Sequence, residues 1–280
     1  MENILITGVS TGIGYSLCKV YLAKGCRVFG SVRKEEDAKR LSEEFGDKFH
    51  ALIFDVTDHT AVSSAAEKAT KMVGEEGLSC LINNAGIAVG GPIMFTSLED
   101  YQRQFDVNLF GVIAVTKAFL PLLGAVENYK NPPGKILNIS SVSGQIAFPF
   151  LSPYCASKFA LEAFGDCLRR EMLIYGIDVI SIEPGAIKTP IWSKPKQLRE
   201  DIKASVFWGA LKKFYKQMAK SEESGMESDD LAYEVFRVYA KKNPKTRYVF
   251  MNKKFTNYTI PRHLIGPRKF DAILKKIYYP

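Results

Sequence analysis

Short apolar runs alternate with longer amphipathic stretches along almost the whole chain. Each run is rich in Ile, Leu, Val or Phe and is bounded by glycine or polar residues, as buried strands are. Between the runs, apolar residues recur with the spacing of one helix face. The expected strands are residues 3–7, 27–32, 50–54, 78–82, 135–139 and 178–182, with 247–250 as a candidate seventh, and the expected helices are 13–24, 34–45, 60–73, 97–123, 154–175, 229–241 and 266–279.

This alternation predicts an α/β fold with a doubly wound, mainly parallel seven-stranded sheet covered by helices on both faces. A chain of 280 residues can form one such domain, so we expect a single domain over residues 1–280. The pattern changes over about residues 190–228, where aromatic side chains punctuate many lysines. We interpret this stretch as a helical insertion that forms a substrate lid. The alternative is a surface helix whose aromatics pack on the body.

Composition narrows the class of protein. The five cysteines are odd in number and lack Cys-x-x-Cys spacing, which indicates reduced thiols, and no His and Cys cluster suggests a metal site. No apolar run approaches the roughly 18 residues of a membrane span. The first expected strand begins at Asn3, which leaves no room for a signal peptide. We therefore expect a cytoplasmic protein without a metal.

The net charge of +8 is unevenly spread, because residues 186–280 carry 21 basic and 9 acidic residues, against 17 and 21 in residues 1–185. The basic part can attract an anionic cofactor, an acidic substrate, a membrane lipid or nucleic acid. A solvated basic surface is the alternative. The basic C-terminal extension, residues 251–280, ends in a helix that can touch a membrane, its own domain or a partner subunit. We expect no nucleic-acid partner, since no aromatic-basic motif of that kind is present.

A glycine-rich turn, Gly8-Val-Ser-Thr-Gly12-Ile-Gly14, directly follows the first expected strand and opens a helix. Glycines permit a tight turn and let backbone N–H groups approach a pyrophosphate, while the helix N-terminus adds partial positive charge. This order of strand, turn and helix predicts a dinucleotide site.

The second expected strand ends at a basic residue, Arg33, and no acidic residue occurs from Cys26 to Lys34. An acidic residue near this point binds the ribose hydroxyls of NAD, whereas a basic one accommodates the 2′-phosphate of NADP. Arg33 therefore favours NADP, and Ser31 can add a hydrogen bond. The alternative is that Arg33 merely faces solvent.

Other candidate ligand residues stand where expected strands end, which is where ligands bind in such sheets. Asp55 follows the third strand and the run 83–86 (Asn-Asn-Ala-Gly) follows the fourth. Pro184-Gly185 follows the sixth and suits a second close approach of backbone to a ligand. Asn108 lies inside an expected helix, where Asn is a modest helix former and usually has a water or backbone partner.

Tyr154 and Lys158 are four residues apart, so on a helix they share one face. A phenol with a pKa of about 10 is a poor base at neutral pH, and a nearby ammonium lowers that pKa. The spacing therefore predicts a tyrosine that gives and takes protons. Ser141, arriving from the end of the fifth strand, can hold the same substrate oxygen. Alone, such a Tyr-x-x-x-Lys pair is more often a surface contact.

Taken together, these motifs resemble the classical short-chain dehydrogenase/reductase family over nearly the whole chain. The family has a doubly wound (Rossmann) fold, binds a nicotinamide cofactor and transfers hydride between an alcohol and a carbonyl. The motifs that carry the resemblance, in the family's order and spacing, are Thr7-Gly8-x-x-x-Gly12-x-Gly14, Asn83-Asn84-Ala85-Gly86, Asn108, Ser141, Tyr154-x-x-x-Lys158 and Pro184-Gly185.

The resemblance implies a role for each catalytic candidate. Tyr154 is the general acid and base, Lys158 lowers its pKa and binds the nicotinamide ribose, and Ser141 holds the substrate oxygen. Asn108 positions a water in a proton relay behind Lys158. Together with the argument on Ser31 and Arg33 above, the resemblance implies four groups of cofactor-binding residues. They are Gly8, Ser10, Thr11, Gly12, Ile13 and Gly14 at the pyrophosphate; Ser31, Arg33, Asp55 and Val56 at the adenosine end; Asn84, Ala85 and Gly86 at the centre; and Tyr154, Lys158, Pro184, Gly185, Ile187 and Thr189 at the nicotinamide half.

One departure concerns the cofactor. NADP-binding members of the family often carry a basic residue inside the glycine turn, whereas here that segment, residues 9–11 (Val-Ser-Thr), is uncharged. The expectation of NADP therefore rests on Arg33, together with Lys34.

Our leading hypothesis is an NADP-dependent oxidoreductase for a hydrophobic secondary alcohol or ketone that is steroid-, retinoid- or 3-hydroxyacyl-like, because the aromatic insertion favours a hydrophobic substrate. The lysines of that insertion leave an acidic or acyl-carrying substrate as the alternative. Residues 154–164 and the aromatic lid also resemble family members acting on retinoids, steroids and 3-hydroxybutyrate. An alternative is a catalytically silent dinucleotide-binding sensor or scaffold on the same fold. A lipid- or nucleic-acid-binding role for the basic third is the weakest option. We also expect a homodimer or homotetramer through an apolar stripe on the Tyr154 helix, with burial in the core as the alternative; the stripe comprises Phe159, Ala160, Ala163, Phe164 and Cys167.

Overall fold

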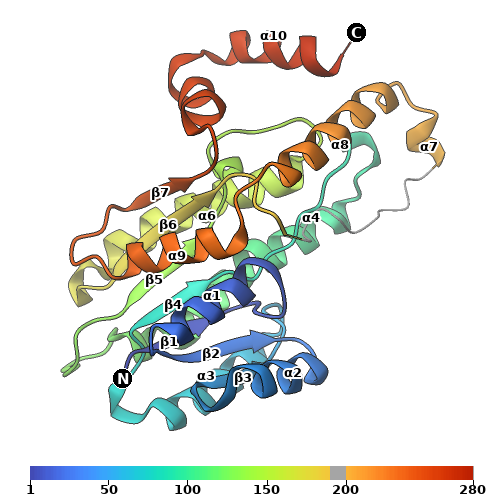
Figure 1. Ribbon diagram of the computed structural model, residues 1–280. Coiled ribbons are helices and arrows are strands. Elements are labelled where there is room, and N and C mark those ends of the chain that lie inside the picture. The colour runs from blue at the N-terminus through green and yellow to red at the C-terminus, as the bar shows by residue number, and fades with distance from the viewer. Residues whose placement is uncertain (190–199, 280) are drawn as a thin grey trace.

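Seven parallel strands form one sheet in the order β3-β2-β1-β4-β5-β6-β7 (Figure 1). The computed structural model describes residues 1–189 and 200–279, so Trp192 and the first part of the expected lid lie outside the described residues. The strand order reverses at β1, which pairs with β2 on one side and β4 on the other. Such a reversal point is where open α/β sheets bind ligands. The expected doubly wound fold is confirmed.

The elements follow the expected alternation, with small shifts at their ends. The strands are β1 (Asn3–Ile6), β2 (Arg27–Val32), β3 (Phe49–Ile53), β4 (Cys80–Asn83), β5 (Lys135–Ile139), β6 (Asp178–Pro184) and β7 (Arg247–Phe250). The helices are α1 (Gly12–Ala23), α2 (Glu35–Phe45), α3 (His59–Val73), α4 (Leu98–Phe105), α5 (Gly111–Phe119), α6 (Ser152–Glu171), α7 (Glu200–Lys203), α8 (Trp208–Glu223), α9 (Ser228–Tyr239) and α10 (Pro267–Tyr278).

Two apolar cores lie on opposite faces of the sheet. Ile4 and Ile6 of β1 face the core that contains α1, α2 and α9, whereas Leu5 between them faces the core with α3, α5 and α6. All three side chains are fully buried. Because successive strand residues point to opposite faces, a strand buried on both sides needs a continuous apolar run, which is the pattern seen in the sequence.

One long helical segment, residues 98–123, crosses the second face. Ser97 caps its start by accepting a 3.1 Å hydrogen bond from the backbone N–H of Asp100. A π-helical turn, Asp106–Phe110, separates α4 from α5. Contrary to our expectation, the helical segment Leu98–Leu123 contains an 18-residue window with a mean hydropathy of 1.5, so by length and composition alone it could cross a membrane. The segment packs against α3 and α6, as a core helix of this sheet does.

Helix α8 of the lid stretch packs on the body, and α10 of the C-terminal extension packs against α8. Figure 1 shows α10 on the far side of α8 from the sheet. Phe214 of α8 is 4% exposed and packs on Phe150, with ring centroids 5.6 Å apart. Tyr278 of α10 joins them, 6.0 Å from Phe214. The aromatic face of α8 therefore packs on the body, as the alternative interpretation has it. The C-terminal helix packs on its own domain.

Candidate active site

The first turn of α6 carries the two residues singled out by their spacing. Pro153 sits in that turn, where its missing N–H costs little. Tyr154 and Lys158 follow one turn apart and are both buried, at 8% and 6% exposure. The ammonium nitrogen of Lys158 lies 5.9 Å from the centroid of the Tyr154 ring. The structure thus brings the pair together in a site sheltered from water.

Ser141 reaches the same site from the end of β5. Its side chain accepts a 3.0 Å hydrogen bond from the backbone N–H of Ser143, which fixes the 3-10 turn Val142–Gly144. The hydroxyl is also hydrogen-bonded to Tyr154, and this bond lowers the pKa of the phenol. Serine and tyrosine hydroxyls therefore converge on one point, as two groups holding one substrate oxygen must.

Burial, rather than the attraction between the phenol and the ammonium, has the largest effect on the pKa values of Tyr154 and Lys158. Desolvation raises the pKa of Tyr154 to about 12 in spite of the bond from Ser141. Desolvation also lowers the pKa of Lys158 to about 8, against the opposing charge of Glu162. Our expectation of a lowered tyrosine pKa is therefore wrong for the protein alone. The phenol is protonated at neutral pH, which suits it to donate a proton.

Asn108 lies in the π-helical turn and is 1% exposed. Its side chain accepts from the backbone N–H of Ile87 at 2.9 Å and donates to the carbonyl of the same residue at 3.0 Å. It also donates to Ser157 on α6 at 3.2 Å, and Ser157 donates to the carbonyl of Tyr154 at 2.8 Å. Asn108 is thus tied to the backbone that carries Tyr154. The water relay stays a prediction.

Gln104 is a supporting residue that the sequence did not reveal. It is fully buried, accepts from the backbone N–H of Val89 at 2.6 Å and donates to the carbonyl of Ile87 at 2.8 Å. Together with Asn108 it fixes the loop after β4 beside the site. In the sequence, Gln104 cannot be distinguished from any other polar residue of a helix, so no pattern predicted its role.

The glycine turn fits a dinucleotide pyrophosphate. Gly8 and Gly12 have φ values of 71° and 62°, where glycine is favoured. A Cβ at Gly14 would lie 2.2 Å from the carbonyl oxygen of Gly8, so the turn closes only with glycine there. Within the described chain, Thr11 makes no side-chain cap to α1, whose first turn holds no acidic residue. Backbone donors of that turn are left for an anion. Ile13 lies in this first turn.

Ser31 has a different role from the one expected. It is 2% exposed, and its hydroxyl accepts a 2.9 Å hydrogen bond from the backbone N–H of Gly8. Its carbonyl accepts from the N–H of Val9 at 3.0 Å. Ser31 therefore holds the glycine turn against β2, and its hydrogen bond to a 2′-phosphate stays a prediction.

Arg33 and Asp55 meet at the adjacent ends of β2 and β3. A guanidinium nitrogen of Arg33 lies 3.7 Å from a carboxylate oxygen of Asp55, and the arginine side chain is 70% exposed. The carboxylate also accepts from the backbone and hydroxyl of Thr57 at 3.0 and 2.8 Å. Val56 is buried beside them and contacts Gly111. The structure thus joins the predicted adenosine-side residues.

Arg40 on α2 is a second cation that the sequence did not place at the site. Its guanidinium donates to the carbonyl of Ser10, in the middle of the glycine turn, at 2.9 Å. Asp37 at 3.0 Å and Glu44 at 3.7 Å hold it there. The charges of Asp37, Arg40 and Glu44 follow one another at three and four residues, and in a sequence such spacing is also typical of a helix surface that faces solvent. A positive charge therefore stands beside the uncharged residues 9–11.

The side chain of Asn84 supports the glycine turn. Its side-chain amide donates to the carbonyls of Thr7 and Gly8, at 2.8 and 3.0 Å. The hydroxyl of Thr7 accepts from the backbone N–H groups of Asn84 and Ala85, both at 2.9 Å. A Cβ on Gly86 would lie 3.4 Å from Asn108. The strand end after β4 is thus locked to the glycine turn after β1.

The loop after β6 lies against the C-terminal part of the chain. The backbone N–H of Gly185 donates to the carbonyl of Phe250 at 2.9 Å, and a Cβ at Gly185 would lie 2.5 Å from Met251. Ile187 is 6% exposed, and Pro184 ends β6. Thr189, half-buried, is the last described residue before the gap. These residues are placed together at one sheet edge.

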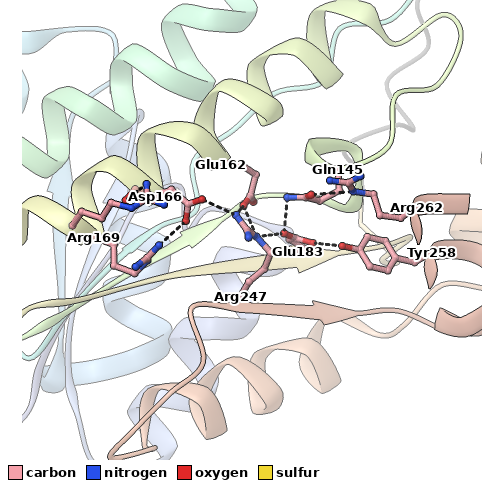
Figure 2. A network of polar contacts seen from close by, with 9 residues as sticks. Gln145, Glu162, Asp166, Arg169, Glu183, Arg247, Tyr258 and Arg262 are labelled. Carbon is pink, nitrogen blue, oxygen red and sulfur yellow. Dashed lines mark hydrogen bonds and ion pairs between the residues drawn. The ribbon is translucent and has the colours of Figure 1, made fainter. Parts of the chain in front are cut away.

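Beside this loop lies a buried ionic network that no sequence pattern predicted (Figure 2). Arg247 of β7 contacts Glu162 of α6 and Glu183 of β6, both at 2.7 Å, and Asp166 at 3.6 Å. The side chains of Glu162 and Glu183 are 5% and 0% exposed. Removing one partner of such a buried cluster leaves an uncompensated charge, so the network holds the three elements together.

Comparison with known proteins agrees with this geometry. The family model described as short chain dehydrogenase matches residues 2–200. The chain is 42% identical over 276 residues to an NADPH-dependent 3-dehydrocapnine reductase of Ornithobacterium rhinotracheale, covering 99% of this chain and 97% of that protein. It is 34% identical to an uncharacterised oxidoreductase of Bacillus subtilis, covering 97% and 96%. A short-chain dehydrogenase structure from Streptomyces avermitilis has a TM-score of 0.77 at 24% identity, covering 99% and 97%.

The chain therefore belongs to the short-chain dehydrogenase/reductase family. It is an oxidoreductase of the class that acts on alcohols and carbonyls with a nicotinamide cofactor.

Proposed function

We propose that this protein is an NADPH-dependent reductase of a hydrophobic ketone whose carbonyl lies near one end of a long apolar group. The observation that carries the proposal is the buried convergence of Ser141 and Tyr154 beside an apolar cluster. That cluster surrounds the N-terminus of α6 and includes Phe150, Leu151 and Cys155 from the body, and Leu211 and Phe214 from α8.

The proton chemistry follows from the state of the three polar groups. The bound cofactor supplies the hydride. Tyr154, protonated because of its raised pKa, gives its proton to the substrate oxygen as negative charge develops there. Ser141 donates to the same oxygen, and this fixed donor stabilises the charge without reorganisation. Lys158, held at 2.8 Å by the carbonyl of Ile139, brings positive charge next to the phenol.

Two arginines support NADPH as the cofactor. Arg33 stands at the end of β2 and Arg40 beside the carbonyl of Ser10, and these two guanidinium groups would hold a 2′-phosphate at the adenosine end. Arginine binds phosphate in a bidentate way that suits this position. The name of the 42% identical relative states NADPH dependence, which supports the same cofactor here.

The substrate class is supported by the same relative and by the apolar cluster. The name of that relative states reduction of a 3-dehydro compound. A 3-oxo substrate agrees with our expectation of a 3-hydroxyacyl-like compound. Steroid and retinoid substrates remain the other members of the expected class. An apolar chain packed on α8 gains about 0.8 kcal/mol for each buried methylene.

The experiment that tests this function follows nicotinamide absorbance with 3-dehydrocapnine, 3-oxo compounds of increasing chain length, a steroid ketone and retinal. NADPH and NADH are compared in parallel. We expect turnover with NADPH, and a kcat/KM that rises by up to about fourfold for each methylene that the site buries. NADPH binding without turnover on any of these substrates would support the sensor alternative instead.

We also propose a cytoplasmic homodimer or homotetramer. On the stripe of α6 the structure leaves Phe159 42% exposed, and Ala163 and Cys167 are exposed beside it, whereas Phe164 turns partly into the core. An exposed aromatic in a row of small residues fits a helix packed against a second copy.

A further inference from the structure

The C-terminal extension reaches the active-site loops through two side chains. Tyr258 and Arg262 lie one turn apart on the π-helical segment Phe255–Leu264, which follows β7. The hydroxyl of Tyr258, a residue only 7% exposed, donates to Glu183 at 3.3 Å. The guanidinium of Arg262 donates to the side-chain oxygen of Gln145 at 3.3 Å. Figure 2 shows both contacts at the right-hand end of the network.

Gln145 and Glu183 each lie next to a loop of the site. Gln145 closes the turn that Ser141 opens, because its backbone N–H donates to the carbonyl of Val142 at 3.0 Å. Glu183 directly precedes Pro184, where the loop at the nicotinamide half begins. The side chain of Gln145 donates to Glu183 at 3.2 Å, so the two loops are joined to each other as well.

The same cluster fastens these loops to the catalytic helix. Arg247 bridges Glu183 to Glu162, and Glu162 lies one turn beyond Lys158 on α6. The catalytic serine, the nicotinamide-side loop and the catalytic helix therefore share one buried polar cluster. Tyr258 and Arg262 are the contributions of the C-terminal extension to that cluster.

We propose that Tyr258 and Arg262 are positioning residues, which hold the Ser141 turn and the Pro184–Gly185 loop in register with the Tyr154–Lys158 helix. The proposal rests on the proposed function, since it assigns to the C-terminal extension a part in the geometry of that site. Displacements well below 1 Å matter for reacting groups, and distant residues can cost up to about 100-fold in rate through them. Both residues act through the partners of their hydrogen bonds, Glu183 for Tyr258 and Gln145 for Arg262.

The surroundings of Tyr258 make this proposal testable without unfolding the protein. An open cavity of about 550 Å³ lies against the outer side of the cluster, lined by Tyr258, Arg262, Gln145 and Arg247 among other residues. Water can enter there and replace a lost hydroxyl, so a single-atom deletion at Tyr258 leaves no dry void.

Glu183 provides a readout that a merely structural residue does not move. The groups facing it are Glu162, with Asp166 behind it, on α6, Arg247 on β7, and Tyr258 and Gln145. Burial and then Glu162 raise the pKa of Glu183 to about 7, while Arg247, Tyr258 and Gln145 lower it. The carboxylate that completes the cluster is therefore present above about pH 7 and is lost as the pH falls through that value.

The test compares Tyr258→Phe and Arg262→Gln with matched changes on the same extension, Tyr279→Phe and Arg268→Gln, which lie outside the cluster. For each purified full-length protein, kcat and KM for the ketone, NADPH affinity by fluorescence titration from pH 5.5 to 8.5, and thermal unfolding are measured. We expect kcat to fall about three- to tenfold in both cluster variants, with Tm and KM close to the parent values.

In Tyr258→Phe we also expect the pH midpoint of NADPH affinity to move upwards, because the bond that lowers the pKa of Glu183 is gone. Control variants should match the parent in every measurement. Cluster variants with parental kcat and an unmoved midpoint would overturn the proposal, and so would a loss of rate that merely follows a lower Tm. A parent protein that binds no NADPH would instead count against the proposed function itself.

Discussion

The ammonium of Lys158 donates a 2.8 Å hydrogen bond to the carbonyl oxygen of Ile139, the last residue of β5. Ser141 follows only two residues later, so the lysine and the serine are positioned by the same short piece of backbone. The bond also keeps a buried ammonium partly solvated by the protein. This bond holds helix α6 and strand β5 together at the site of the reaction. The effects of changing individual residues of the site can be predicted separately.

Replacing Tyr154 with Phe removes the proton donor and little else, because the ring stays in place. We expect turnover of the ketone to fall by about 100- to 10,000-fold, the range that general acid catalysis supplies. NADPH affinity, measured by fluorescence titration, should stay within about twofold of the parent value. Tyr175→Phe, on a residue 38% exposed in the 3-10 turn Met172–Tyr175 that follows α6, is the matched control. Undiminished turnover in Tyr154→Phe would exclude the proposed acid.

Lys158 should make stability rise with pH. Its pKa is lowered from 10.5 to about 8 in the fold, so between these values the unfolded chain holds a proton that the folded chain does not. The unfolding free energy of the parent relative to Lys158→Met should therefore increase from pH 7.5 to 9.5, by about 2 kcal/mol at about 1.4 kcal/mol per pKa unit. Tyr154 is present in both proteins, so its titration cancels. Urea unfolding at each pH measures the difference, and a difference that is flat or falls with pH contradicts the prediction.

Arg40 and Arg33 should both discriminate NADPH from NADH. Each guanidinium adds a charge-assisted contact to the 2′-phosphate, and the loss of about 1.4 kcal/mol is a tenfold change in affinity. Arg40→Gln and Arg33→Gln should each weaken NADPH binding about tenfold and leave NADH binding almost unchanged. Titration with 2′-AMP, which carries the phosphate without the nicotinamide, isolates the effect. Equal losses for both cofactors would show that Arg40 only supports the glycine turn.

Phe159 should hold the expected oligomer together. A glutamate in place of this half-exposed ring puts a charge into an apolar contact, and desolvating an unpaired charge is strongly unfavourable. We expect Phe159→Glu to shift the protein towards the monomer in light scattering after gel filtration, with far-UV circular dichroism unchanged. Leu173→Glu, at a residue 71% exposed beyond the stripe, is the control. A parent protein that is already monomeric excludes this interface.

Much of the fold was predictable because both cores rest on sequence patterns of short range. Ile4, Leu5 and Ile6 form a continuous apolar run, and such runs mark strands buried on both faces. The Tyr154 and Lys158 spacing predicted a shared helix face, which the structure shows. Ser97 caps the start of α4, close to where the sequence predicted that the helix begins.

The rest depended on contacts between residues far apart in the chain. Arg247 meets Glu162 across 85 positions, and nothing near either residue in the sequence marks the pairing. Ser31 was predicted to bind the cofactor because it stands near the end of an expected strand beside Arg33, and nothing in the sequence showed that its hydroxyl accepts from the backbone N–H of Gly8. The pKa of Tyr154 was misjudged for a similar reason, since spacing reveals the neighbouring lysine but not the degree of burial.

The placement of Tyr278 has a consequence for the order in which a growing chain can acquire its function. The glycine turn, the loop after β4 and the strands that carry them are complete within the first third of the chain, whereas the aromatic cluster on α8 receives Tyr278 only at the very end. Chains emerge from the ribosome N-terminus first and fold as they do so. A nascent molecule can therefore begin to shape its glycine turn long before the aromatic cluster on α8 is complete.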